Sequence, residues 1–145
     1  MSYLQGFQVV VTSESSSIQA LQQRVAALLD ELGYSTRDMF CIRLGLEEAL
    51  VNAVQHGNHG ESSRTVVVGC MIDSERTRIE IEDAGQGFQV DAVPSPITPD
   101  NLHDVDGRGR GLLLMRSFLD KVEYNEVGNR LVLERDRRFD SPGDE

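Results

Sequence analysis

The chain has 145 residues, with 14 lysines and arginines, 24 aspartates and glutamates, and a formal net charge of −10 at pH 7. This length predicts one domain with its own core, which needs no disulfide or structural metal. The acidic charge disfavours direct binding to a nucleic-acid backbone. The sequence has no secretory signal and no apolar run that could cross a membrane, so we expect a cytoplasmic protein with its two cysteines, Cys41 and Cys70, reduced.

The first part of the chain predicts a strand followed by two helices. Residues 7–12 are β-rich, and the serines within 13–17 suit the start of a helix. Apolar residues recur at helical spacing from there to Gly33, a residue type that ends helices. A second helix is predicted from about Ser35 or Thr36 to Gly57.

Two polar faces run along this second helix. Glu48, Asn52 and His56 are four residues apart and therefore share one face, whereas Arg43 and Glu47 form a separate, water-facing pair. A surface helix needs only one polar face, so the other face predicts a helix that packs in the core and lines a pocket. An Asn oxygen suits Mg²⁺, and a Glu one turn away can orient or deprotonate an attacking hydroxyl.

Two other interpretations of the Glu48 face stay open. It can be a solvated stripe on the helix surface, which is the commoner meaning of such a triplet. A zinc site formed by His56, His59 and His103 is less favoured, because no pair of cysteines or histidines has the spacing of zinc ligands.

Residues 65–72 and 76–82 are β-rich and predict a hairpin with a turn at 73–75. Asp83 follows the second strand, and Gly85 and Gly87 come directly after it. A carboxylate at a strand end can accept a hydrogen bond from an adenine amino group, and glycines let a ligand approach the backbone. The same pattern also occurs in ordinary turns, so both interpretations remain.

A long loop is predicted over residues 89–106, which hold three of the four prolines and little periodicity. Loops of this length are usually functional lids or disordered segments. A third helix is predicted over 111–119, and the glycine-rich segment 107–111 precedes it. Free N–H groups at the start of this helix can hold phosphate oxygens, with added charge from Arg108 or Arg110. The glycine spacing fits neither the dinucleotide-binding pattern nor the P-loop.

The chain closes with a hairpin predicted over residues 121–125 and 129–135. The tail from Asp136 onward is charged and is expected to fray. We therefore predict one domain over residues 1–136 and a charged tail over 137–145.

Three motifs in this order resemble the N, G1 and G2 boxes of the GHKL, or Bergerat-fold, ATP-binding superfamily: Glu48-x-x-x-Asn52-x-x-x-His56-Gly57, Asp83-x-Gly85-x-Gly87-Phe88 and Gly109-Arg110-Gly111-Leu112-x-Leu-Met. Within that superfamily the chain looks most like the anti-sigma-factor serine kinases of bacterial partner-switching systems. The resemblance implies an α+β two-layer sandwich, with a mixed, mostly antiparallel sheet and about three helices packed on one face. It also implies a homodimer.

The resemblance further implies a role for each motif. Asn52 would coordinate Mg²⁺, Glu48 would be the general base for phosphorylating a serine, and Asp83 would bind adenine. The ATP lid would extend over about residues 88–108. Some kinases of this group carry an Arg-x-Gly-x-Gly run in the lid, and here Gly107 stands at the position of that Arg. The remaining predicted nucleotide contacts are His56, Gly85, Gly87, Phe88, Arg108, Gly109, Arg110, Gly111 and Leu112.

The function implied by this resemblance is that of an ATP-dependent anti-sigma factor and protein-serine kinase. Its partners would be a sigma factor and a STAS-type anti-sigma-factor antagonist, the latter being the phosphoryl acceptor. The alternative is an ATP-binding switch regulator that sequesters a partner protein without significant kinase activity. Neither nucleic acid nor a membrane is an expected direct partner.

Overall fold

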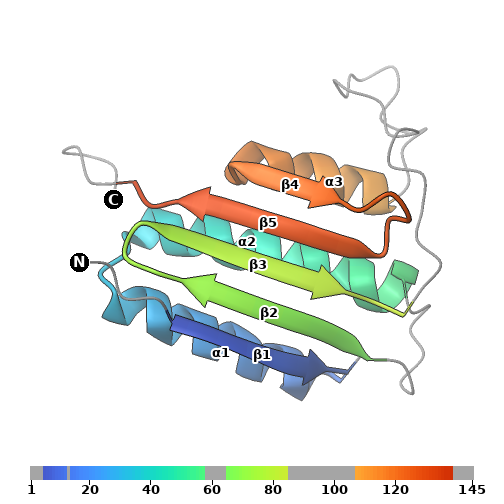
Figure 1. The fold of residues 1–145 in the computed structure, drawn as a ribbon, viewed down its shortest axis with the longest axis horizontal. Coiled ribbons are helices and arrows are strands. Elements are labelled where there is room, and N and C mark those ends of the chain that lie inside the picture. The colour runs from blue at the N-terminus through green and yellow to red at the C-terminus, as the bar shows by residue number, and fades with distance from the viewer. Residues whose placement is uncertain (1–4, 13, 58–64, 85–106, 139–145) are drawn as a thin grey trace.

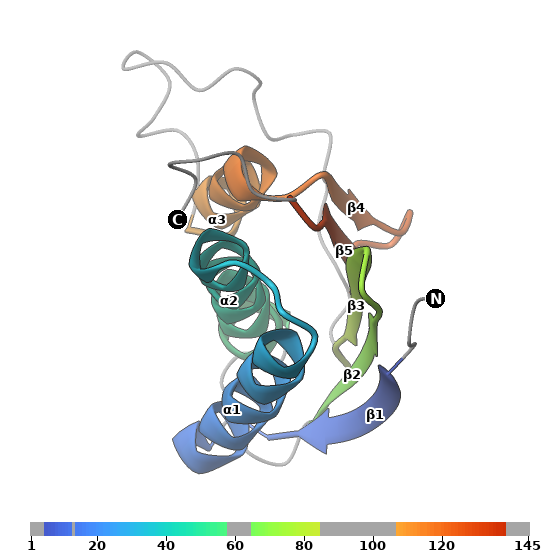
Figure 2. The same ribbon diagram turned by 90° about the vertical axis from the view of Figure 1, so that its left-hand side faces the viewer.

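A five-stranded sheet carries three helices on one of its faces in the computed structural model (Figures 1 and 2). The structure describes residues 5–12, 14–57, 65–84 and 107–138. Its elements, in chain order, are β1 (Gln5–Val11), α1 (Ser15–Glu31), α2 (Thr36–Val51), the π-helical turn η1 (Asn52–Gly57), β2 (Val66–Ile72), β3 (Arg76–Glu82), α3 (Gly107–Phe118), β4 (Lys121–Tyr124) and β5 (Arg130–Asp136). The predicted α+β two-layer sandwich is confirmed.

The strand order is β1-β2-β3-β5-β4, and both predicted hairpins, β2–β3 and β4–β5, are present. Every pairing between the described strands is antiparallel, whereas the family resemblance implied a mixed, mostly antiparallel sheet. Tight turns within the hairpins require antiparallel neighbours. Between β1 and β2 the chain passes through two helices, and β2 then runs antiparallel to β1.

The first two helices begin and end close to their predicted positions. After α1, Gly33 adopts a left-handed backbone with φ of 81°, and the N–H of Tyr34 donates to Leu29 O at 3.0 Å. This conformation suits glycine and ends the helix. Ser35 then caps α2, because its Oγ accepts a hydrogen bond from the Asp38 N–H at 3.1 Å.

Two features of the helices differ from the prediction. The second helix ends in the wide turn η1 over Asn52–Gly57, for which the apolar pattern gave no signal. Helix α3 begins at Gly107, four residues before its predicted start at Gly111. Glycines lower helix propensity by about 1 kcal/mol each, so the sequence favours a helix that starts only at the end of the glycine-rich segment. Packing of α3 against α2 outweighs that preference.

The core lies between the helices and the sheet (Figure 2). Each layer contributes fully buried side chains, which include Leu29 of α1, Leu46 and Leu50 of α2, Leu112 and Met115 of α3, and Val66, Ile72, Ile79 and Leu131 of the sheet. Their spacing of three and four residues in helices and two in strands follows the periodicities from which the elements were predicted. Among the described residues, no helix is long and apolar enough to span a membrane.

The predicted start of the frayed tail, at residue 137, is too early in the chain. Arg137 donates from Nη1 to Leu32 O at 3.1 Å and to Ser74 O at 3.2 Å, and from Nη2 to Gly33 O at 2.6 Å. These bonds join the residue that follows β5 to the α1–α2 turn and the β2–β3 turn. Arg138 is also anchored, by a bidentate pair with Asp120 at 2.6 and 2.7 Å. Residues 139–145 lie outside the described part of the chain.

Candidate nucleotide site

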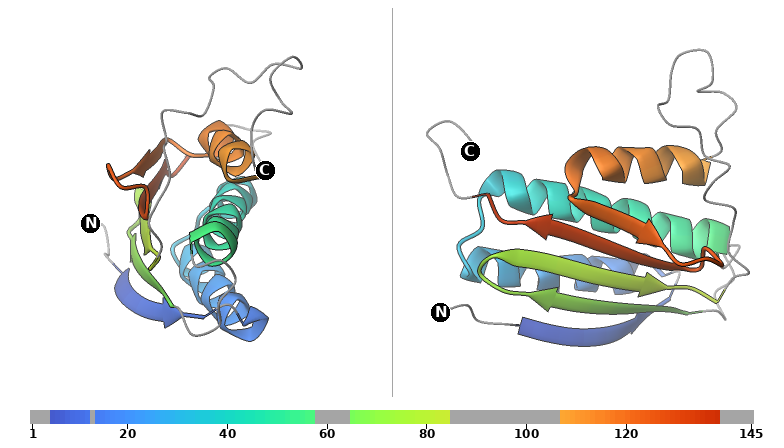
Figure 3. Two further views of the ribbon diagram at one scale, coloured as in Figure 1. Left: turned by 90° about the vertical axis from the view of Figure 1, so that its right-hand side faces the viewer. Right: turned by 45° about the horizontal axis from the view of Figure 1, so that its top comes forward.

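The residues of the three predicted motifs that the structure describes lie at one end of the sandwich. Figures 1 and 3 show the end of β3, the turn η1 and the beginning of α3 side by side at this end. Asp83 follows β3, Asn52 opens η1, and Gly107 opens α3. Segments far apart in the sequence therefore form one candidate site.

The polar face of α2 that carries Glu48 and Asn52 lies against α3. A Cβ atom placed on Gly111 would lie 2.8 Å from Glu48 Oε2 and 3.2 Å from Asn52 Nδ2. Asn52 is only 2% exposed, whereas Arg43 and Glu47 on the other polar face are exposed. These positions contradict the interpretation of Glu48 and Asn52 as a solvated stripe.

Close packing between α2 and α3 explains how the glycine reaches these side chains. One turn before Glu48, a Cβ atom on Gly45 would lie 2.6 Å from Leu119 Cδ1, just beyond the end of α3. Gly45 of α2 and Gly111 of α3 therefore permit the close approach of the two helices. The N and G2 motifs meet because neither Gly45 nor Gly111 carries a side chain.

The turn η1 changes the register of the helix after Asn52. A π turn closes its hydrogen bonds at i+5 rather than i+4, so successive turns contain about one more residue. The regular α-helical spacing that predicted one continuous face for Glu48, Asn52 and His56 is therefore interrupted after Asn52. The side chain of His56 lies outside the described part, and its contact with a nucleotide stays a prediction.

Asp83 is buried to 8% exposure directly after β3. Its backbone N–H donates to Asn129 O at 3.0 Å, which holds the end of β3 beside the β4–β5 turn. An aspartate of an ordinary surface turn would be exposed to solvent, as charged side chains usually are. Burial therefore favours a binding role over simple turn chemistry. Gly85, Gly87 and Phe88 lie outside the described residues.

The beginning of α3 supplies backbone donors for an anion. The first N–H groups of a helix have no partner within it, and because α3 begins at Gly107 these groups belong to the Gly107–Gly109 region. Gly111 lies one turn further on, beside Glu48 and Asn52. Leu112 is 0% exposed in the core, which gives it a packing role. The side chains of Arg108 and Arg110 and most of the predicted lid lie outside the described residues.

The donor set at Asn52 suits magnesium better than zinc. Mg²⁺ favours oxygen ligands and usually takes few from the protein, since substrate phosphates and waters complete its shell. The buried Asn52 amide, beside the Glu48 carboxylate, fits this arrangement. Within the described residues, no group of three or more His, Cys, Asp and Glu side chains could hold a metal ion. The histidines of the zinc hypothesis lie outside that description, His56 as regards its side chain.

A buried ion pair escaped the sequence analysis. Arg135 donates from Nε to Asp38 Oδ1 at 2.9 Å and from Nη1 to Phe118 O at 2.7 Å, and Asp38 Oδ2 accepts from the N–H of Arg138 at 2.9 Å. The pair joins α2, β5 and the end of α3. Asp38 lies on the same face of α2 as Cys41, Gly45, Glu48 and Asn52, at spacings of three and four residues. This spacing indicates that Asp38 faces the interior.

Residues 11–135 match the family model of the histidine kinase-like ATPase domain. The chain belongs to the histidine kinase-like ATPase domain family. This membership confirms the resemblance to GHKL ATP-binding proteins, and the family's nucleotide is ATP.

Two similar proteins fall within the predicted branch of this ATPase family. The chain is 27% identical over 123 residues to a protein named serine-protein kinase RsbW from Halalkalibacterium halodurans, covering 82% of this chain and 75% of that protein. It is 26% identical over 100 residues to a protein named anti-sigma F factor from Oceanobacillus iheyensis, covering 68% of each.

A solved structure shares the fold of this ATPase domain. The structure of the RsbU and RsbW domains of Rv1364c from Mycobacterium tuberculosis superposes with a TM-score of 0.62 at 15% identity. The superposition covers 95% of this chain and 33% of that longer chain, so the similarity concerns one part of it.

Proposed function

We propose that this protein is an ATP-dependent protein-serine kinase that also acts as an anti-sigma factor. The observation that carries the proposal is the close approach of Gly111 to Glu48 and Asn52, which lays the expected phosphate-binding segment beside the expected base and metal ligand. Relatives named as a serine-protein kinase and as an anti-sigma factor support the same function.

In this function each described motif residue has a separate task. Asp83 accepts a hydrogen bond from the adenine amino group, and backbone N–H groups at the start of α3 bind phosphate oxygens. Asn52 holds Mg²⁺, which when bound offsets the negative charge of the phosphates. Glu48 takes the proton of the acceptor serine hydroxyl as its oxygen bonds to the γ-phosphorus, and ADP leaves with the electrons of the broken P–O bond.

The phosphoryl acceptor in this proposal is a STAS-type anti-sigma-factor antagonist, and the competing partner is a sigma factor. Nucleotide state and phosphorylation would decide which partner is bound, because a ligand shifts an equilibrium only through its different affinity for the two states. The protein would act in the cytoplasm, with the lid over about residues 88–108 closing on ATP.

A homodimer is part of the same proposal. None of the described elements covers the sheet face opposite the helices (Figure 2), and its β1–β2 half presents Val10 at 62% and Met71 at 47% exposure. Register places both side chains on this outer face, since Gly6 pairs with Met71 and Val10 with Val67. Burying this surface between two copies would be favourable. Light scattering of wild type and Met71→Asp should then give a dimer and a smaller species, respectively.

A second candidate is an ATP-binding switch regulator with negligible phosphotransfer. The residue at the lid position where some kinases of this group carry Arg is Gly107, and this favours weaker handling of the γ-phosphate. Such a protein would still bind ATP and hold its partner. The two candidate functions therefore differ only in whether the γ-phosphoryl group is transferred to the partner.

Transfer of labelled γ-phosphate from Mg·ATP to proteins in an extract of the host, which must contain unphosphorylated antagonist, tests the choice. We expect label on one small protein, lost with Glu48→Gln and kept with Glu47→Gln, the exposed neighbour on α2. ATP binding without any label would support the switch regulator. Failure to bind ATP would overturn both candidates.

A further inference from the structure

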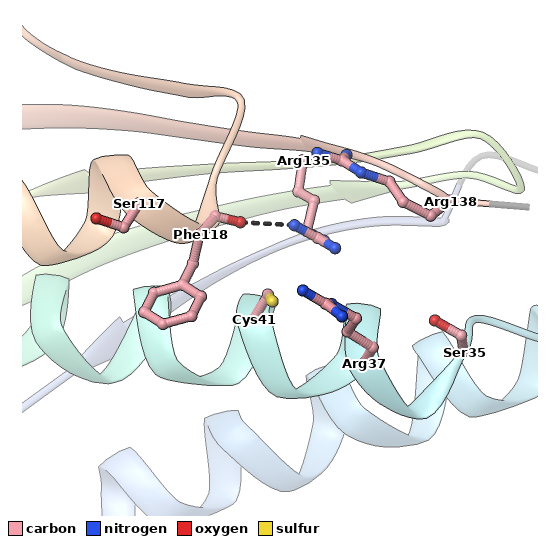
Figure 4. A pocket seen from close by; sticks show the side chains of 7 residues that line it. All are labelled: Ser35, Arg37, Cys41, Ser117, Phe118, Arg135 and Arg138. Atoms are coloured by element: carbon pink, nitrogen blue, oxygen red, sulfur yellow. Dashed lines mark hydrogen bonds between the residues drawn. The ribbon is translucent and has the colours of Figure 1, made fainter. Parts of the chain in front are cut away.

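A pocket of about 380 Å³ opens between the beginning of α2, the end of α3 and the end of β5 (Figure 4). It lies at the opposite end of α2 from Asn52. Three arginines, Arg37, Arg135 and Arg138, line it. Cys41 and Phe118 form a less polar wall. Nothing in the proposed kinase mechanism uses this pocket.

Two of the three arginines are neutralised by partners. Arg135 is paired with the buried carboxylate of Asp38, with Nη2 and Oδ1 2.8 Å apart. Arg138 forms its bidentate pair with Asp120, at 2.6 and 2.7 Å. Each of these positive charges therefore has a negative charge beside it.

Arg37 has no such partner within the part of the chain that the structure describes. The residues three and four positions away on its helix side are Gly33, Tyr34, Phe40 and Cys41, and none of them is acidic. Figure 4 shows the guanidinium groups of Arg37 and Arg135 pointing toward one another across the pocket. Among the described residues the pocket thus keeps one uncompensated positive charge, in a chain whose net charge is −10.

We propose that this pocket binds an oxyanion, the phosphate or carboxylate group of a small ligand. A guanidinium offers planar paired donors that match both groups. Ser35 adds a hydroxyl, because its oxygen already accepts from the Asp38 N–H and its proton remains to be donated. Phe118 and Cys41 provide room for an apolar portion of the ligand, and the volume suits a small molecule.

The oxyanion has two possible sources. One is a free small molecule, and the other is the chain itself, since the residues that follow Arg138 include Asp140, Asp144 and Glu145. Both sources use the same chemistry at Arg37. The experiment below separates them.

The test is an NMR titration of the full chain with inorganic phosphate and, separately, with acetate, at constant ionic strength set by sodium chloride. We expect saturable shifts of the Arg37 Nε–H and the Cys41 backbone N–H signals. Arg37→Gln should weaken binding about tenfold, as for loss of one charge-assisted hydrogen bond. Arg43→Gln is the matched control, because Arg43 is exposed on the same helix and lines a different groove. A shift of the Arg37 signal reports binding in this pocket, because phosphate bound near Asn52 would lie at the other end of α2.

Neutralising the acidic residues, with Asp140→Asn, Asp144→Asn and Glu145→Gln together, identifies the source. Tighter binding of the added anion in this triple variant would mean that the chain's own carboxylates compete for the pocket. Unchanged binding would point to a free ligand. Absence of saturable shifts in both wild type and triple variant, or equal weakening by Arg37→Gln and Arg43→Gln, would overturn the proposal.

Discussion

Gly111 of α3 lies so close to Glu48 of α2 that a single added carbon would sit 2.8 Å from the glutamate Oε2. The neighbour at risk is the end of a flexible side chain, which can move aside. A substitution here should therefore displace the candidate base without unfolding the protein.

We expect Gly111→Ala to separate activity from stability. Alanine improves helix propensity by about 1 kcal/mol, which offsets the steric cost, so the melting temperature should stay near that of wild type. Phosphotransfer should fall about 100-fold, since small displacements of catalytic groups have effects of that size. Gly69→Ala is the control, because nothing lies within 4 Å of its added carbon. Full transfer by Gly111→Ala would contradict the placement of Glu48.

Asp83→Asn should abolish nucleotide binding or weaken it at least about 100-fold, because the amide cannot accept the adenine hydrogen bond in the same way. Calorimetric titration with Mg·ADP measures the effect. Glu82→Gln, which changes the exposed neighbour on β3, should bind as wild type does. Equal affinities of Asp83→Asn and wild type would remove the adenine assignment.

Asp38→Asn should destabilise the protein by about 3 kcal/mol, because it leaves the guanidinium of Arg135, which is only 5% exposed, without its counter-charge. Urea unfolding measures the loss. The double variant Asp38→Leu with Arg135→Met should recover part of it, since apolar replacement removes the buried charge as well. Asp30→Asn, on the exposed side of α1, should change stability by no more than about 0.5 kcal/mol. If the separate effects of Asp38→Leu and Arg135→Met on stability add up to the effect of the double variant, the two residues are not coupled.

The pair between Asp120 and Arg138 should make stability depend on pH at the acidic end. Hydrogen bonding from Arg138 lowers the pKa of Asp120 below its ordinary value of 3.8. Because the folded-state pKa is the lower one, the stabilisation is present above the unfolded-state pKa and is lost as pH falls through the folded-state pKa.

Thermal unfolding of wild type and Asp120→Asn over a range of pH tests this dependence. At neutral pH we expect the variant to be less stable by at most about 1 kcal/mol, since the pair is partly exposed to solvent. The two curves should converge only once the pH has fallen below the lowered folded-state pKa of Asp120, where the wild-type carboxyl is neutral as well. A difference that stays constant down to the lowest pH would exclude the ion pair as its cause.

The helices and strands were predictable because local pattern and final environment agree. Leu21, Val25 and Leu29 recur at helical spacing and lie in the core. Ile79 and Ile81 alternate with charged residues on β3. Gly33 and Ser35 mark their helix ends through local backbone and capping chemistry. The fold class and the family followed from these patterns together with the three motifs.

The remaining features depend on contacts between distant segments. The apolar pattern could not reveal that α3 begins at Gly107, because glycine disfavours an isolated helix and only packing against α2 compensates. The π turn at Asn52 has no pattern of its own. The partner of Asp38 is Arg135 on the last strand, and no local rule links them.

Arg137 joins two turns at the end of the sandwich that is remote from the motif residues. The side chain of Arg137 connects Leu32 and Gly33 of the α1–α2 turn to Ser74 of the β2–β3 turn. Its Cζ atom lies 5.3 Å from the centre of the Tyr34 ring. The two turns at the end remote from the motif residues are therefore held together. We therefore expect the α1–α2 and β2–β3 turns to keep their places during any rearrangement where Asn52, Asp83 and α3 meet.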